Sequence, residues 1–232
     1  MRKVTIALLA LGLVVATSAF ASTSIRISQV YGGGGSSSGT YQYDYVELYN
    51  NSGSPVSIAG WTLQYGSATG SFASNTFGIA TLPAGATIPA CGYYLIQCGS
   101  AGSGGAALPV TPDFANAAGP NLSGTSGKVA LFTDAVTNRT CAQALAVPPE
   151  DLVGYGTANC YEGTAAVGTL SATTVAIRGS AGITDNDQNS TDLTVMNEPQ
   201  TMHNAAGGST NPGCQIVPTI PSTWGKIKTL YR

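Results

Sequence analysis

The 232-residue chain carries little charge: Asp, Glu, Lys and Arg make up 9% of it, against about 25% in an average soluble domain. Its formal net charge of −2 provides no basic field, so nucleic acid is not an expected partner. Hydrophobic residues reach 43%, which is enough for a packed core and argues against wholesale disorder. The 30 glycines and 12 prolines indicate many loops.

The first residues have the pattern of a secretory signal peptide. Arg2 and Lys3 form a charged start, Val4 to Val15 an apolar stretch, and Ala19-Phe20-Ala21 a small-residue cleavage pattern. The apolar stretch is shorter than the ~20 residues of a membrane-spanning helix, and no other segment approaches that length. We therefore predict a signal peptide over 1–21 and no transmembrane segment. The mature chain would be secreted to the extracellular space or the cell surface, or alternatively to the periplasm.

The mature part contains short strand patterns separated by turns rich in Gly, Pro and Ser. Between residues 43 and 50, Val46 and Leu48 alternate with Glu47, which predicts Val46 and Leu48 on one face of a strand and Glu47 on the other. Strands are expected at 25–31, 43–50, 60–65, 93–97, 128–133, 151–155 and 173–178, and again at 193–195. Long Gly/Ser-rich loops are expected at 32–39 and 99–119. This pattern predicts an all-β sandwich.

All five cysteines follow the signal peptide, and an oxidising compartment favours disulfides. Cys141 and Cys160 flank one loop-and-strand unit and are predicted to pair, which would stabilise the fold by about 3 kcal/mol. Cys91 and Cys98 bracket a predicted strand and would lie about 20 Å apart, too far to bond to each other. The odd number leaves at least one thiol free or paired between molecules. The pairing of Cys91, Cys98 and Cys214 stays open.

Three segments carry a family resemblance: Ile27 to Gly35 (ISQVYGGGG), Asp44 to Asn50 (DYVELYN) and Ile58 to Tyr65 (IAGWTLQY). In this order they resemble the lamin tail domain in its bacterial, secreted form, over roughly 23–206. The resemblance implies an immunoglobulin-like β-sandwich used for binding or scaffolding, with no catalytic residues. It also implies that the motif residues are fold determinants: Asp44, Glu47, Asn50 and Trp61. We therefore expect one domain over 22–206, followed by a linker and C-terminal tail over 207–232.

The densest group of oxygen ligands lies at 185–192. A D-x-D-x-N spacing lets alternate side chains converge on a hard cation such as calcium. The candidate ligands are Asp185, Asp187, Asn189 and Asp192. Gly at the sixth position and Glu at the twelfth are missing, so the loop is not an EF-hand. The alternative is an Asx-rich turn leading into the next strand. Calcium is the one cofactor that the sequence suggests.

Tyrosines gather on one predicted strand. Tyr43, Tyr45 and Tyr49 fall on a single face with Glu47 between them. If solvent reaches that face, the three rings could form a platform for a sugar or a protein, since tyrosine offers large contact area at low entropic cost. The alternative is that loops cover this face of the sandwich.

The last residues carry Lys226, Lys228 and Arg232 interleaved with the apolar Ile227 and Leu230. One interpretation is an attachment signal or docking peptide at the cell envelope. The other is a frayed tail or a last strand on the sandwich.

Taken together, these features predict a secreted, non-catalytic binding or structural module on the outside of a bacterial cell. Its partner would be a protein or an envelope or extracellular polymer. The alternatives are a calcium-stabilised adhesion or matrix protein and an accessory module of an extracellular hydrolase. His203, the single histidine, has no oriented partner in the sequence and is predicted to be an ordinary loop residue. The oligomeric state stays open.

Overall fold

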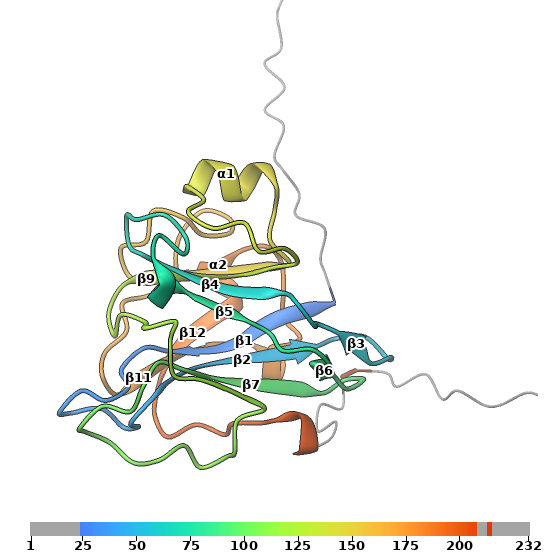
Figure 1. The fold of residues 1–232 in the computed structure, drawn as a ribbon. Helices are drawn as coiled ribbons and strands as arrows, with labels where there is room; N and C mark the ends of the chain where they lie inside the picture. Colours follow the sequence, from blue (N-terminus) through green and yellow to red (C-terminus); the bar gives the residue numbers. More distant parts are fainter. Residues whose placement is uncertain (1–23, 208–212, 215–232) are drawn as a thin grey trace, which may run out of the picture.

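The computed structural model describes residues 24–207 and 213–214. The predicted signal peptide and nearly all of the predicted tail lie outside the described residues. Within them, two main β-sheets pack face to face, and the helices are short (Figure 1). None of these helices combines the length and the apolar character needed to cross a membrane.

The larger sheet has six strands in the order β12-β11-β1-β2-β7-β8. All its pairs are antiparallel except β7 with β8, which is parallel. The strands are β1 (Ile25–Tyr31), β2 (Asp44–Asn50), β7 (Tyr93–Cys98), β8 (Phe114–Asn116), β11 (Thr174–Arg178) and β12 (Leu193–Asn197).

The second sheet has four antiparallel strands in the order β10-β9-β4-β5. They are β4 (Thr62–Ser67), β5 (Ile79–Thr81), β9 (Gly127–Phe132) and β10 (Asp151–Tyr155). A small ribbon pairs β3 (Val56–Ser57) with β6 (Thr87–Ile88). The helical segments are α1 (Cys141–Ala146), α2 (Asn189–Asp192), η1 (Thr76–Gly78), η2 (Ser180–Gly182) and η3 (Ala205–Gly207). The prediction of an all-β, immunoglobulin-like sandwich is confirmed.

Alternation along the strands explains the core between the sheets. Val46 and Leu48 of β2 share one face, as predicted, and that face packs into the core with Leu63 and Leu131 from the other sheet. Trp61 packs against the same core while half-buried. Burial of this continuous apolar cluster is the main source of stability, at about 25 cal/mol per Å² of apolar surface removed from water.

Both sheets also carry apolar residues on their outer faces. On the six-stranded sheet a second cluster contains Tyr31, Tyr45, Leu95, Val175 and Met202, four of which alternate with core residues along their strands. On the four-stranded sheet a third cluster contains Phe72, Ala130, Phe132, Ala144 and Leu152. Each outer face therefore needs another segment to cover it. The candidate site lies where such a segment covers the outer face of the six-stranded sheet.

Candidate functional site

The predicted tyrosine platform is not at the surface. Tyr45 and Tyr49 are 0% exposed, and Tyr43 is half-buried. Tyr45 stacks on Tyr31 with 5.5 Å between ring centroids, and its hydroxyl lies within hydrogen-bond distance of Gln29 and Glu198. The prediction of an exposed platform is wrong for Tyr45 and Tyr49, because alternation along a strand cannot show that a distant segment covers that face.

One of the segments that cover this face runs from Glu198 to Gly207, and we call it the strap; Tyr41, Leu108 and Val110 pack into the same tyrosine cluster. Its Thr201 carbonyl accepts from Gln29 Nε2 at 2.8 Å, and its Ala205 N–H donates to Asp113 at 3.0 Å. Met202 is buried in the tyrosine cluster. The strap therefore supplies polar bonds and an apolar plug to the outer face of the six-stranded sheet.

Glu47 is the centre of the polar contacts under the strap. Its side chain is buried, and each carboxylate oxygen accepts one short bond: Oε1 from Ser28 Oγ and Oε2 from the His203 N–H, both at 2.6 Å. His203 Nδ1 lies 3.2 Å from the same Oε2. The register of β1 against β2 shifts between Ile27 and Gln29, so Ser28 is the extra residue of a β-bulge. The bulge is what brings the serine hydroxyl to Glu47.

A cavity of about 170 Å³ lies beside these residues. It is lined by Ser28, Glu47 and Tyr93, by residues of the strap, among them His203, and by residues of η2. The rings of Tyr93 and His203 stack with centroids 4.2 Å apart. Pockets that enclose drug-sized ligands usually measure about 300–1,000 Å³. The cavity is therefore too small for such a ligand.

The backbone of η2, on the other side of the cavity, is strained. Ser180 and Ala181 have φ angles of 53° and 54°, in the left-handed region that costs a non-glycine residue about 1–2 kcal/mol. The Tyr93 hydroxyl donates to the Ala181 carbonyl at 2.9 Å and helps to hold this conformation. Strain of this kind concentrates at clamps and binding sites.

The arrangement of Ser28 and His203 bears on catalysis. A serine nucleophile needs its hydroxyl in contact with a base. Here the Ser28 hydroxyl donates to Glu47 Oε1, while His203 contacts the other carboxylate oxygen. Glu47 thus lies between the serine and the histidine, which bond to opposite oxygens of its carboxylate.

A second buried polar cluster joins the two sheets. The Arg178 guanidinium on β11 is 0% exposed and contacts Asp151 on β10 through Nη2, at 2.8 Å from Oδ2. Arg178 Nη1 lies 3.2 Å from Asp185 Oδ1. The second carboxylate oxygen, Asp185 Oδ2, lies 3.0 Å from Arg26 Nε. Burial opposes the charged form of Arg178, but the nearby carboxylates, Asp151 first, raise its pKa overall.

Three of the four predicted calcium ligands have protein partners for their side chains. Asp185 joins the arginine cluster, and Asp192 accepts from the backbone N–H groups of Asn186 and Gln188 at 2.7 and 3.1 Å. Asn189 is buried and bonds to β10 through the Gly154 N–H and the Leu152 carbonyl, both at 2.8 Å.

Asp187 is half-buried, and its N–H donates to Asp185 at 3.4 Å. Among the residues that the structure describes, no group of three or more His, Cys, Asp or Glu is arranged to hold a metal ion. The arrangement is that of the alternative, an Asx-rich turn leading into β12, and calcium binding here stays a prediction.

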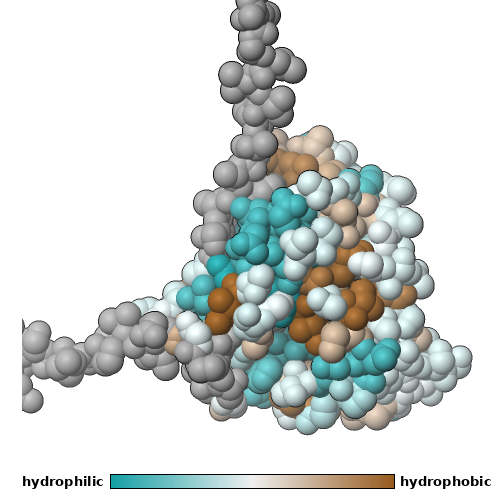
Figure 2. Space-filling view, turned by 180° about the vertical axis from the view of Figure 1, so that it is seen from behind, coloured by the Kyte–Doolittle hydropathy of each residue, from teal (hydrophilic) through white to brown (hydrophobic). Residues whose placement is uncertain are grey.

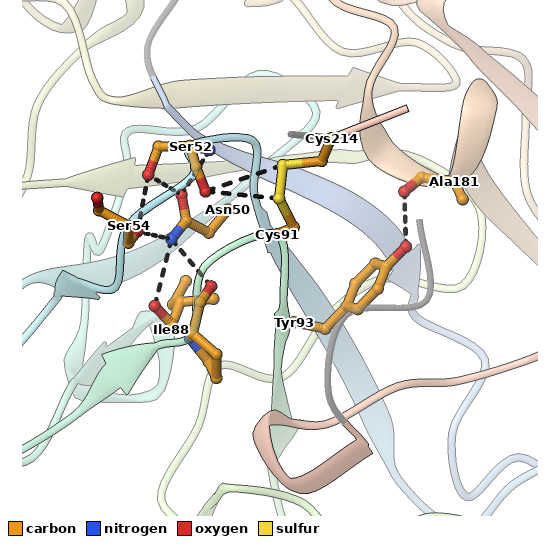
Figure 3. The surroundings of a disulfide bond; sticks show 9 residues. Asn50, Ser52, Ser54, Ile88, Cys91, Tyr93, Ala181 and Cys214 are labelled. Atoms are coloured by element: carbon orange, nitrogen blue, oxygen red, sulfur yellow. Dashed lines mark hydrogen bonds between the residues drawn. A yellow bond between two sulfur atoms is a disulfide. The ribbon is translucent and has the colours of Figure 1, made fainter. Parts of the chain in front are cut away.

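A disulfide links Cys91 and Cys214 near the end of the strap (Figure 3). Cys91 lies just before β7, and the Ser52 carbonyl lies 3.8 Å from both sulfur atoms. Asn50 organises the surrounding turn: its Nδ2 donates to the Ser54 carbonyl at 2.8 Å and its Oδ1 accepts from the Ser52 N–H at 2.9 Å. The sequence left the partner of Cys91 open, and the structure identifies it as Cys214.

The second disulfide joins Cys141 and Cys160, the pair that the sequence predicts, with 5.4 Å between their Cα atoms. Cys141 begins α1, whose N-terminus is closed by a capping box between Thr140 and Gln143. The helix covers the outer face of the four-stranded sheet through Ala144. Cys98 is the remaining thiol and is buried, so it cannot pair between folded molecules.

Sequence reasoning missed the Glu47–His203 contact because it joins residues 156 positions apart. The alternation in Val46-Glu47-Leu48 places Glu47 on the face of β2 opposite the core, but it does not show that another segment covers that face. No comparable signal identifies His203.

Comparison with known proteins agrees with this fold. The family model described as Lamin Tail Domain matches residues 18–145, more than half of the chain. No curated protein matches the chain. Strands β10, β11 and β12 follow the matched part and complete the same two sheets. The chain belongs to the lamin tail domain family, whose members are immunoglobulin-like, non-catalytic modules for binding or structure.

Proposed function

We propose that this protein is an exported, non-catalytic binding or structural module that works on the outside of a bacterial cell. The observation that carries the proposal is the pair of disulfides, Cys91–Cys214 and Cys141–Cys160. Disulfides persist in oxidising compartments and are rare in the cytosol, where thiols are kept reduced. The signal-peptide pattern at 1–21 supports the same compartment.

The surface supports recognition of a macromolecule. The cavity under the strap is small, and the carboxylate that lines it is bonded within the protein. On the face turned away in Figure 1, hydrophobic residues gather in the middle and hydrophilic residues border them (Figure 2). Such patches often mark interaction sites. The partner would be a protein or an envelope or extracellular polymer.

The test is to fractionate cells that express the full chain and to measure the intact mass in each fraction. We expect the protein outside the cytoplasm, starting at Ser22, with the hydrogen atoms of two disulfides missing from its mass. The fraction that holds it then separates a surface module from a freely secreted one. Cytoplasmic protein that keeps residues 1–21 and has reduced thiols would contradict the proposal.

A further inference from the structure

Strand β12 forms an open edge of the six-stranded sheet. Its sequence, Leu-Thr-Val-Met-Asn, contains no charge and no proline. Thr194 and Asn197 are exposed, and the Met196 side chain is 43% exposed. Natural proteins usually protect such edges with lysine, proline or a bulge, because an unprotected edge pairs readily with another strand.

The register with β11 determines which backbone groups of β12 face outward. The Gly179 N–H donates to the Asp192 carbonyl at 2.8 Å, next to the pair of Arg178 with Leu193. Because residues of an antiparallel ladder alternate in the direction of their backbone groups, Thr194 and Met196 bond to β11. The residues whose backbone groups point away from the sheet are Leu193, Val195 and Asn197.

Two of these outward groups already have partners. The Leu193 N–H donates to the Asn189 carbonyl at the end of α2, and Gln200 Nε2 donates to the Asn197 carbonyl at 2.5 Å. The groups that make no hydrogen bond within the described part of the chain are the Leu193 carbonyl, the Val195 N–H and carbonyl, and the Asn197 N–H.

We propose that β12 pairs antiparallel with β12 of a second copy of this chain, centred on Val195, and so joins two sheets into one. Around that centre the two Val195 residues exchange two hydrogen bonds, and each Asn197 N–H reaches the Leu193 carbonyl of the other copy. Every unpartnered group then finds a partner. The two groups that are already bonded, the Leu193 N–H and the Asn197 carbonyl, are the ones that would otherwise have faced each other.

This self-complementarity is why the occupant is a second copy. A two-fold interface brings the same patch of both subunits together, and the set of free donors and acceptors on β12 is its own complement. Thr194 of each copy lies opposite Met196 of the other, which covers the exposed methionine, and no charge of β12 opposes the contact.

The other sheet edges are less suitable. β5 and β8 contain three residues each. β10 is longer, but its outer side is bonded already: the Gly154 carbonyl accepts from the Val167 N–H, and the Gly154 N–H donates to Asn189. Among the described strands of the two main sheets, β12 is the long edge that is left open.

The experiment is sedimentation equilibrium of the oxidised mature protein over a range of concentrations. We expect a concentration-dependent dimer. The double variant Thr194→Lys/Met196→Lys places four lysines opposite one another and should raise the dissociation constant at least about tenfold. The double variant Thr194→Glu/Met196→Lys places opposite charges across the same two pairs and should keep the dimer. Val147→Lys, at a side chain that is 60% exposed outside β12, is the control.

Unfolding curves of each variant show whether the monomer stays folded. A wild-type protein that is monomeric at every concentration overturns the proposal. A dimer that the lysine pair leaves intact, or that the charge pair disrupts as much as the lysine pair, also overturns it, because the register around Val195 requires the two variants to differ.

Discussion

The two outer faces of the sandwich are covered in different ways. The strap holds to the six-stranded sheet mainly through Glu47, Gln29 and Asp113, whereas α1 covers the four-stranded sheet through an apolar cluster. A disulfide secures each cover, but Cys91–Cys214 spans 123 residues and Cys141–Cys160 spans 19. In this molecule, the segment that is distant in sequence is held by specific polar bonds, by the buried Met202 and by a long-range cross-link, whereas the local segment is held by burial and a short cross-link.

The largest expected effect separates the two disulfides. Replacing Cys91 and Cys214 with serine should lower the free energy of unfolding by about 5 kcal/mol, and replacing Cys141 and Cys160 by about 3 kcal/mol, because a longer loop restricts the unfolded chain more. Urea unfolding of both double variants measures the difference. Equal losses would show that loop length does not determine how much each disulfide stabilises the fold.

Truncating the apolar cover should have a slightly smaller effect. Leu152 is buried under α1, and Leu152→Ala should cost about 3–4 kcal/mol through lost burial and the cavity that remains. Hydrogen exchange should then rise around α1 and not in the strap. Faster exchange in both covers would mean that they are coupled through the core.

Removing the carboxylate under the strap should cost about 2–3 kcal/mol. Glu47→Ala leaves the His203 N–H without its acceptor, and it leaves the buried Ser28 hydroxyl only the backbone carbonyl of residue 47, at 3.1 Å. Urea unfolding gives the loss, and hydrogen exchange should rise at 201–205 while α1 is unchanged. The matched variant Glu47→Gln keeps the shape and one acceptor, so its loss should be smaller. An alanine variant as stable as the wild type would contradict the role of Glu47.

The two covers should respond to pH in opposite directions, with small effects. Burial raises the pKa of Glu198 in the strap, so the native state keeps its proton longer than the unfolded chain. The strap therefore loses stability as pH rises above the ordinary pKa of about 4.3. The Arg139 hydrogen bond lowers the pKa of Asp134 next to α1, so stability there is lost as pH falls below about 3.9.

Hydrogen exchange between pH 3 and 6, corrected for intrinsic rates, compares these two responses segment by segment. Glu198→Gln should remove the pH response of the strap, and Asp134→Asn that of the α1 cover. A response of both covers in the same direction would contradict the assignment.

The smallest effect is expected from calcium. The carboxylates of Asp185 and Asp192 are already bonded to Arg178, Arg26 and backbone N–H groups, so a chelator should leave the melting temperature unchanged. A melting temperature that rises by several degrees at saturating calcium would instead support the calcium site that the D-x-D-x-N spacing predicts.

The sequence alone was enough for the longer strands and for the side that each residue of β2 takes, but it did not predict β3, β5, β6 and β8, which have two or three residues each. Alternation in β2 places Val46 and Leu48 in the core, and β1, β10 and β11 lie within one residue of their expected bounds. The motifs around Asp44 and Trp61 also predict the family. These features are local, since they depend on the period of two and on turn residues a few positions away.

Only the tertiary structure decided which distant residues meet. Burial of Tyr45, the contact of Glu47 with His203 and the pairing of Cys91 with Cys214 all depend on where the strap returns to the sheet. The same holds for Asp185, whose carboxylate bonds to Arg178 and Arg26. Spacing along a chain fixes which oxygens are near one another, but a folded chain brings in cations and donors from other strands, and those contacts decide what each carboxylate does.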